Sequence, residues 1–130
     1  MYSKLTLKQR LRVGRNYEKF IAWKLQREGW QVEPRSDYGK YDRGIDLEIR
    51  KEGRTGYVQC KGWSKRKHIH ENSVDQLYGA VAFQEGPENM QKVEMYIYTA
   101  AQPTFYAREH ADKLNIKFFH EPFPRWRRYY

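Results

Sequence analysis

Three polar side chains of an expected β-hairpin, with one acid on an expected helix, have the chemistry needed to hydrolyse a phosphodiester bond. Asp46 could ligate a hard cation such as Mg²⁺, which prefers oxygen ligands, and the Gln59 amide oxygen could be a second, uncharged ligand. Lys61 could hold the attacking water or neutralise charge on a phosphate. Glu18 would complete the carboxylate set if its helix packs beside the hairpin. The competing interpretation is a structural Asp46–Lys61 pair across the strands, and spacing alone does not choose between them.

Alternation of apolar and polar residues predicts the hairpin itself. The alternation covers residues 45–49, turn-forming residues follow at 51–56, and strand-forming residues resume over 57–61. We centre the turn between Gly53 and Arg54. The expected opposed pairs are then Asp46–Lys61, Glu48–Gln59, Leu47–Cys60 and Ile49–Val58. One face carries the apolar residues Ile45, Leu47, Ile49, Val58 and Cys60, and the other carries Asp46, Glu48, Gln59 and Lys61.

Apolar residues at three-to-four spacing predict three helices. The first runs from a capping box at Thr6 to Gly29, and the second covers about 72–84 and ends before Gly86. Thr104 caps the third helix. The apolar residues of this third helix are Phe105, Ala107, Ala111 and Leu114.

Three further strands are expected at 30–32, 93–99 and 116–120, where β-forming residues are concentrated. The resulting order is α-β-β-β-α-β-α-β. Such an order predicts an α/β protein with a mixed sheet and helices packed on it.

The net charge is +9, from 25 Lys and Arg against 16 Asp and Glu. The basic residues are concentrated at 4–15, at 61–67 and in the tail 125–130, where arginines alternate with aromatic rings. Such clusters suit a polyanion, because each cation set against a phosphate releases counterions, and exposed rings can stack on bases. A solvated basic surface that aids solubility is the alternative.

Composition excludes several classes of protein. Cys60 is the single cysteine, which excludes an internal disulfide framework and a multi-cysteine zinc site. No apolar run approaches the roughly 20 residues of a membrane span, and the first residues lack a signal-peptide core. We therefore expect no membrane association and a cytoplasmic location.

Several motifs resemble the Mrr-like restriction endonucleases, a branch of the PD-(D/E)xK nuclease superfamily in which glutamine replaces the usual second acid. The resemblance begins with Gly44-Ile45-Asp46-Leu47 and Val58-Gln59-Cys60-Lys61-Gly62-Trp63. It extends to Gly14, Tyr17 and Glu18, to Gly29-Trp30-Gln31-Val32, to Leu77-Tyr78-Gly79-Ala80, and to Thr99, Thr104, Ala107 and Ala111. It covers about residues 12–120.

The resemblance implies a restriction-endonuclease-like three-layer fold and Mg²⁺-dependent cleavage of DNA, with Mn²⁺ as an alternative ion. It also implies that Asp46 is the metal carboxylate, Gln59 the substituted ligand, Lys61 the catalytic lysine and Glu18 the acid carried on the helix. We expect a single nuclease domain over 1–130. Within it, residues 1–10 form a basic N-terminal arm and residues 121–130 a basic aromatic tail.

DNA is the expected partner. The candidate backbone contacts are Arg10, Arg12, Arg15, Lys65, Arg66 and Lys67. A homodimer is expected, because one small domain covers little DNA and two copies present two sites to two strands. His68 and His70, in the basic loop, are read as solvated or as phosphate contacts. The alternatives to a DNA endonuclease are a resolvase of branched DNA with the same fold and a non-catalytic nucleic-acid-binding module.

Overall fold

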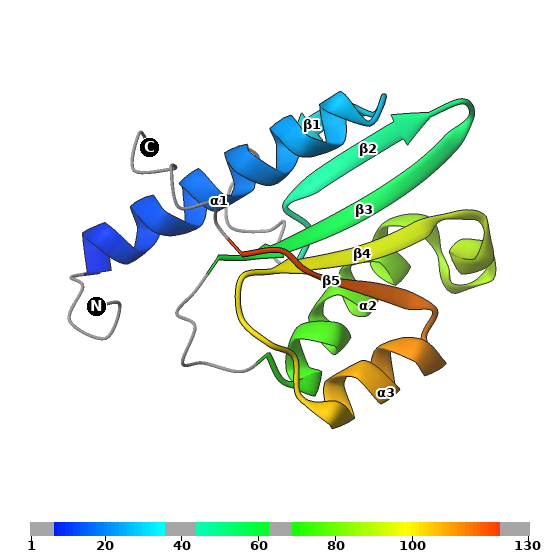
Figure 1. Ribbon diagram of the computed structural model, residues 1–130. Helices are drawn as coiled ribbons and strands as arrows, with labels where there is room; N and C mark the ends of the chain where they lie inside the picture. Colours follow the sequence, from blue (N-terminus) through cyan, green and yellow to red (C-terminus); the bar gives the residue numbers. More distant parts are fainter. Residues whose placement is uncertain (1–6, 36–43, 63–68, 123–130) are drawn as a thin grey trace.

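The computed structural model describes residues 7–35, 44–62 and 69–122 of the chain (Figure 1). Its elements are α1 (Leu7–Arg27), β1 (Gln31–Pro34), β2 (Leu47–Lys51), β3 (Arg54–Lys61), α2 (Glu71–Glu85), the 3₁₀ helix η3 (Pro87–Lys92), β4 (Glu94–Thr99), α3 (Phe105–Lys113) and β5 (Ile116–His120). This is the order expected from the sequence, with η3 added. None of the helices in these ranges has the apolar length that a bilayer crossing requires.

The five strands form one mixed sheet in the order β1-β2-β3-β4-β5. β1, β2 and β3 pair antiparallel, whereas β3, β4 and β5 pair parallel. Figure 1 shows α1 over one face of the sheet and α2 and α3 against the other. The predicted α/β class, with a mixed sheet between helices, is therefore confirmed.

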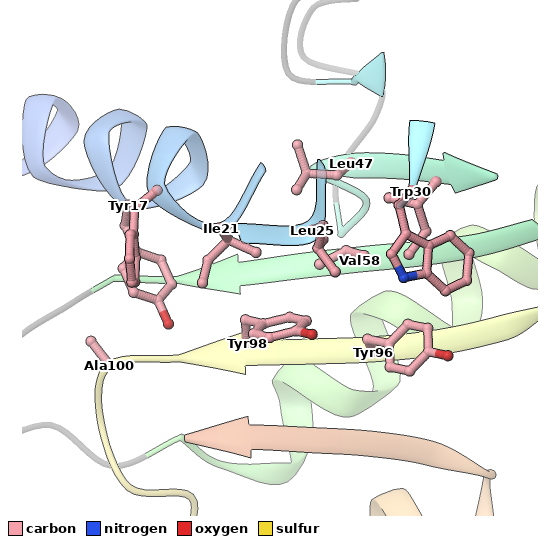
Figure 2. Close-up of a cluster of buried hydrophobic side chains, with 11 residues drawn as sticks. Tyr17, Ile21, Leu25, Trp30, Leu47, Val58, Tyr96, Tyr98 and Ala100 are labelled. Carbon is pink, nitrogen blue, oxygen red and sulfur yellow. The ribbon is translucent and has the colours of Figure 1, made fainter. Parts of the chain in front are cut away.

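The first core lies between α1 and the sheet (Figure 2). Tyr17, Ile21 and Leu25 recur every four residues along α1, so they share one face of the helix. They pack on buried side chains of the strands and of the turn before β1. These partners are Trp30, Leu47, Ile49, Val58, Tyr96 and Tyr98. This packing places the middle of α1 over β3 and so determines the distance between the backbone of Glu18 and the sheet.

The second core lies on the opposite face, where α2 and α3 cover the parallel strands. Its principal members are Ile45, Tyr57, Val74, Leu77, Val81, Met95, Ile97, Ala111 and Ile116. The prediction for α3 is correct for its cap and small residues: the Thr104 hydroxyl accepts a hydrogen bond from Ala107 N at 3.1 Å, and Ala107 is buried. Phe105 is the first residue of α3, as expected, but it is 70% exposed and is not part of the core.

The hairpin register differs from the expected one by two residues. Leu47 pairs with Val58, and Lys51 pairs with Arg54. The expected pairs Asp46–Lys61, Glu48–Gln59, Leu47–Cys60 and Ile49–Val58 are therefore wrong. The cause is a tight turn in which Glu52 and Gly53 both have positive φ, 51° and 79°. Two consecutive left-handed residues make the two-residue turn that matches the strand twist.

A shift of two residues leaves each side chain on its expected face, because the strand period is two. Leu47, Ile49 and Val58 do share the α1 side of the sheet, with Cys60 packed against them. Ile45 is the exception, since it packs in the second core with Tyr57. It precedes the first residue of β2, so the alternation of the strand does not govern it.

Candidate active site

Asp46 stands directly before β2 and bonds to β3 on both sides of Gln59. Its N–H donates to the carbonyl of Val58 at 2.8 Å, and its Oδ2 accepts a hydrogen bond from the N–H of Cys60 at 2.7 Å. Oδ1 makes no hydrogen bond with the described residues. The carboxylate is thus held in one place by backbone and retains an oxygen for a further ligand.

Gln59 is buried, with 1% of its surface exposed. Its Nε2 donates to the carbonyl of Gly44 at 3.3 Å, whereas no group in the described ranges bonds to its Oε1. Gly44 has φ +93°, and a Cβ there would lie 2.7 Å from the carbonyl oxygen of Gln76 on α2. The turn that holds the Gln59 amide therefore requires glycine. A buried, unpartnered amide oxygen costs stability, which is typical of a group kept for a ligand.

Lys61 ends β3, and its ammonium is electrostatically coupled to Asp46. Burial lowers the pKa of Lys61, and the nearby Asp46 carboxylate opposes this shift. Burial raises the pKa of Asp46, and the Cys60 N–H and the Lys61 charge counteract it. The acid and the lysine are therefore partly desolvated neighbours, and each favours the charged form of the other.

Glu18 on α1 reaches the same region. The pKa of the buried Cys60 thiol is raised first by desolvation and then by the charges of Asp46 and Glu18, whereas Lys61 lowers it. All three charged groups are therefore near enough to Cys60 to act on its thiol electrostatically. Cys60 itself is a packing residue of the α1 core.

Tyr17 ties α1 to the end of the sheet that carries these groups. Its hydroxyl donates to the carbonyl of Glu121 at 2.8 Å, just after β5, and the Lys24 ammonium lies 3.1 Å from the Glu121 carboxylate. The Glu121 N–H donates to the Thr99 carbonyl at 2.8 Å. The sequence predicts Tyr17 only as an apolar residue of the first helix and part of the family-like motif, and it predicts no role for Glu121, because a contact 104 residues apart leaves no local signal.

The donor set fits a hard divalent cation. Asp46, Gln59 and Glu18 offer only oxygen atoms, which Mg²⁺ prefers, and the Gln59 oxygen has no other partner in the described part of the chain. Within that part, no three His, Cys, Asp or Glu side chains are grouped as metal ligands. The candidate ligands Asp46, Gln59 and Glu18 do not form a group of that kind, because Gln59 is an amide.

The predicted DNA contacts are only partly within the described structure. Arg15 is exposed on α1, whereas the side chains of Arg10 and Arg12 are not described. Lys65, Arg66, Lys67 and His68 lie outside the described residues. His70 is exposed and stands at the N-cap of α2.

An antiparallel hairpin joined to a parallel β3-β4-β5 sheet, with an acid, an amide and a lysine at one end, defines a restriction-endonuclease-like protein. The chain belongs to the Mrr-type restriction endonuclease family, whose catalytic-domain model matches residues 12–121. The resemblance inferred from the sequence motifs is thereby confirmed.

One solved structure shares the fold at low sequence identity, and another gives a weaker match. A protein of unknown function, AF1548, matches with a TM-score of 0.62 and 15% identity, over 79% of this chain and 56% of that chain. A repair endonuclease from Pyrococcus abyssi matches with a TM-score of 0.46 and 17% identity, over 62% of this chain and 33% of its own. The present chain thus spans little more than half the length of AF1548 and about a third of the length of the repair endonuclease. No curated protein matches significantly.

Proposed function

We propose that the protein is a DNA endonuclease that hydrolyses phosphodiester bonds with a divalent cation, Mg²⁺ being the expected ion. The observation that carries the proposal is the Asp46 carboxylate, held at 2.7 Å by the Cys60 N–H, next along β3 to Gln59 with its unpartnered Oε1. The charges of Lys61 and Glu18 act on the same part of the site. Membership of a restriction endonuclease family over residues 12–121 supports the same activity.

Asp46, Gln59 and Glu18 would hold the cation, which when bound supplies Lewis-acid stabilisation of the phosphate and a more acidic water. Lys61 has three N–H donors, and it orients the attacking water and donates to a phosphate oxygen on which charge develops. The Asp46 carboxylate favours the charged form of Lys61, against the desolvation that lowers the pKa of this lysine. The Cys60 N–H holds the Asp46 carboxylate still, so little reorganisation is needed when substrate arrives.

Nicking of supercoiled plasmid, with Mg²⁺ or with EDTA, tests this function. Asp46→Asn and Lys61→Ala should each lower the nicking rate by about 100-fold or more. Lys113→Ala, at an exposed lysine of α3, should keep the wild-type rate. A wild type inert on plasmid, linear duplex and four-way junction would exclude the proposal. So would wild-type rates in both site variants. The junction arm also separates a branched-DNA resolvase from an enzyme that prefers linear duplex.

A further inference from the structure

The outward face of α1 presents a row of side chains that the core does not use. Arg15, Lys19, Trp23 and Arg27 follow one another at intervals of four residues, and all four are exposed, Trp23 at 46%. We call these four residues the outer row of α1. The opposite side of the helix is the one buried in the core (Figure 2).

Within the described part of the chain, no acidic neighbour neutralises the cations of the outer row. α1 contains seven basic residues and a single acid, Glu18, and its first turn has no acid. Lys24, off the row, pairs with Glu121 at 3.1 Å and with Glu28 at 4.0 Å. By contrast, Arg15, Lys19 and Arg27 form no ion pair with any residue in the described ranges. Arg27 lies in the last turn of α1, where a cation favours the helix dipole, whereas Arg15 and Lys19 lie outside both terminal turns, so the dipole does not account for these two cations.

Trp23 holds the far end of the row in place. The Arg27 guanidinium lies over the Trp23 ring, 5.1 Å from its centroid. A cation–π contact of this kind restricts the rotamers of a long side chain while leaving its N–H donors free. Arg27 is therefore partly ordered before any partner binds, which lowers the entropic cost of a contact to an anion.

We infer that the outer row of α1 contacts the phosphate backbone of DNA that extends away from the cleavage point. The inference rests on the proposed function. Lys19 follows Glu18 directly along α1, so the row passes next to a residue of the candidate active site. Arg27 lies twelve positions after Arg15, which at the rise of an α-helix is about 18 Å. This is the length of about five base pairs, so the bound duplex extends at least that far on the α1 side.

A lipid surface does not fit the outer row, because a membrane-bound amphipathic helix inserts its apolar face. The apolar face of α1 is already covered by the sheet. The row itself offers three cations around one indole, which matches a backbone of regularly spaced phosphates.

The test removes two charges from the row and, in a matched control, two charges from the other side of the sheet. Lys19→Gln/Arg27→Gln is compared with Lys92→Gln/Lys113→Gln, whose lysines are exposed on η3 and α3. Affinity for a 30-base-pair duplex is measured by fluorescence anisotropy in EDTA over a range of salt. The row variant should bind about tenfold more weakly, and the slope of log K against log salt should fall in magnitude by about 1.8. The control should keep nearly the wild-type slope.

The outcomes separate this inference from the function on which it rests. If wild type nicks plasmid with Mg²⁺ but both double variants bind DNA equally well, the outer row is not a DNA contact and the endonuclease proposal stands. If wild type neither binds nor cleaves DNA, both proposals fail. If the row variant alone loses affinity and salt dependence, the assignment of the row is supported.

Discussion

Gly62, one residue beyond Lys61, lies directly against Tyr17 of α1: a Cβ added at Gly62 would come within 2.3 Å of the Tyr17 Cβ. Helix and strand can approach this closely only because residue 62 has no side chain. Tyr17 precedes Glu18, so the contact sets the separation of Glu18 from Lys61.

Gly62→Ala should therefore impair both the fold and the site. The added methyl meets the base of the Tyr17 side chain, which cannot rotate away, so α1 must shift. Such overpacking should lower the free energy of unfolding by about 1–3 kcal/mol. Urea unfolding measures this loss. A displacement of about 1 Å at Glu18 should lower plasmid nicking by about 100-fold.

Gly79→Ala is the matched control, because a Cβ at Gly79 meets no atom within 4 Å. A glycine within α2 replaced by alanine should raise stability by about 0.5–1 kcal/mol and leave nicking unchanged. If Gly62→Ala behaved like this control, the contact with Tyr17 would not govern the geometry of the site.

Tyr17→Phe removes only the hydroxyl that donates to the Glu121 carbonyl. The ring stays packed, so the loss of stability should be about 1 kcal/mol. Because α1 is then less firmly tied to the end of β5, nicking should fall by about tenfold. Tyr106→Phe, at a tyrosine 67% exposed on α3, is the control and should change neither quantity. Wild-type nicking in Tyr17→Phe would show that packing alone positions Glu18.

Glu94 and Arg54 should make stability depend on pH. Two hydrogen bonds of 2.7 Å from Arg54 are the main reason that the pKa of Glu94 falls from 4.5 to about 2. A lowered pKa means that the pair stabilises the fold above about pH 4.5 and loses this effect as pH falls through 2. Because the pair is partly exposed, Glu94→Gln should cost only about 0.5–1 kcal/mol at pH 7.

Urea unfolding at several pH values checks this expectation. The difference between wild type and Glu94→Gln should shrink steadily below about pH 4.5. Glu109→Gln, at an exposed glutamate of α3, serves as the reference for removing one negative charge. A difference that stayed constant down to pH 2 would exclude the Arg54 pair as its source.

The sequence specified local structure well because its signals are local. Thr104 caps α3 as expected, and β5 covers 116–120 as predicted. The hairpin faces also follow from alternation. The register does not, because it depends on whether Glu52 adopts a left-handed conformation, a rare state for a residue with a side chain.

The candidate site could be named from residue types but not assembled from them. That Glu18 lies near Lys61 depends on the Tyr17–Gly62 contact, between residues 45 positions apart. That Gln59 is buried depends on α2 meeting the turn at Gly44. Such close approaches arise from packing of distant elements, which periodicity does not report. The contacts of residues 63–68, the homodimer and the cytoplasmic location stay predictions.

Gln59→Met separates the stability of the site from its capacity to bind a metal. Methionine is similar in size and removes the unpartnered Oε1 together with the hydrogen bond from Nε2 to Gly44. Removing the unpartnered oxygen should stabilise the fold, whereas losing the hydrogen bond should destabilise it. The free energy of unfolding without metal should therefore stay within about 1 kcal/mol of wild type. Mn²⁺ at 100 times its dissociation constant should stabilise wild type by about 2.7 kcal/mol in thermal unfolding without DNA, and most of this gain should vanish in the variant. Gln76→Met, at an exposed glutamine of α2, should keep the full gain. If Gln59→Met kept it too, the amide oxygen would not be a ligand and the acids alone would have to hold the ion.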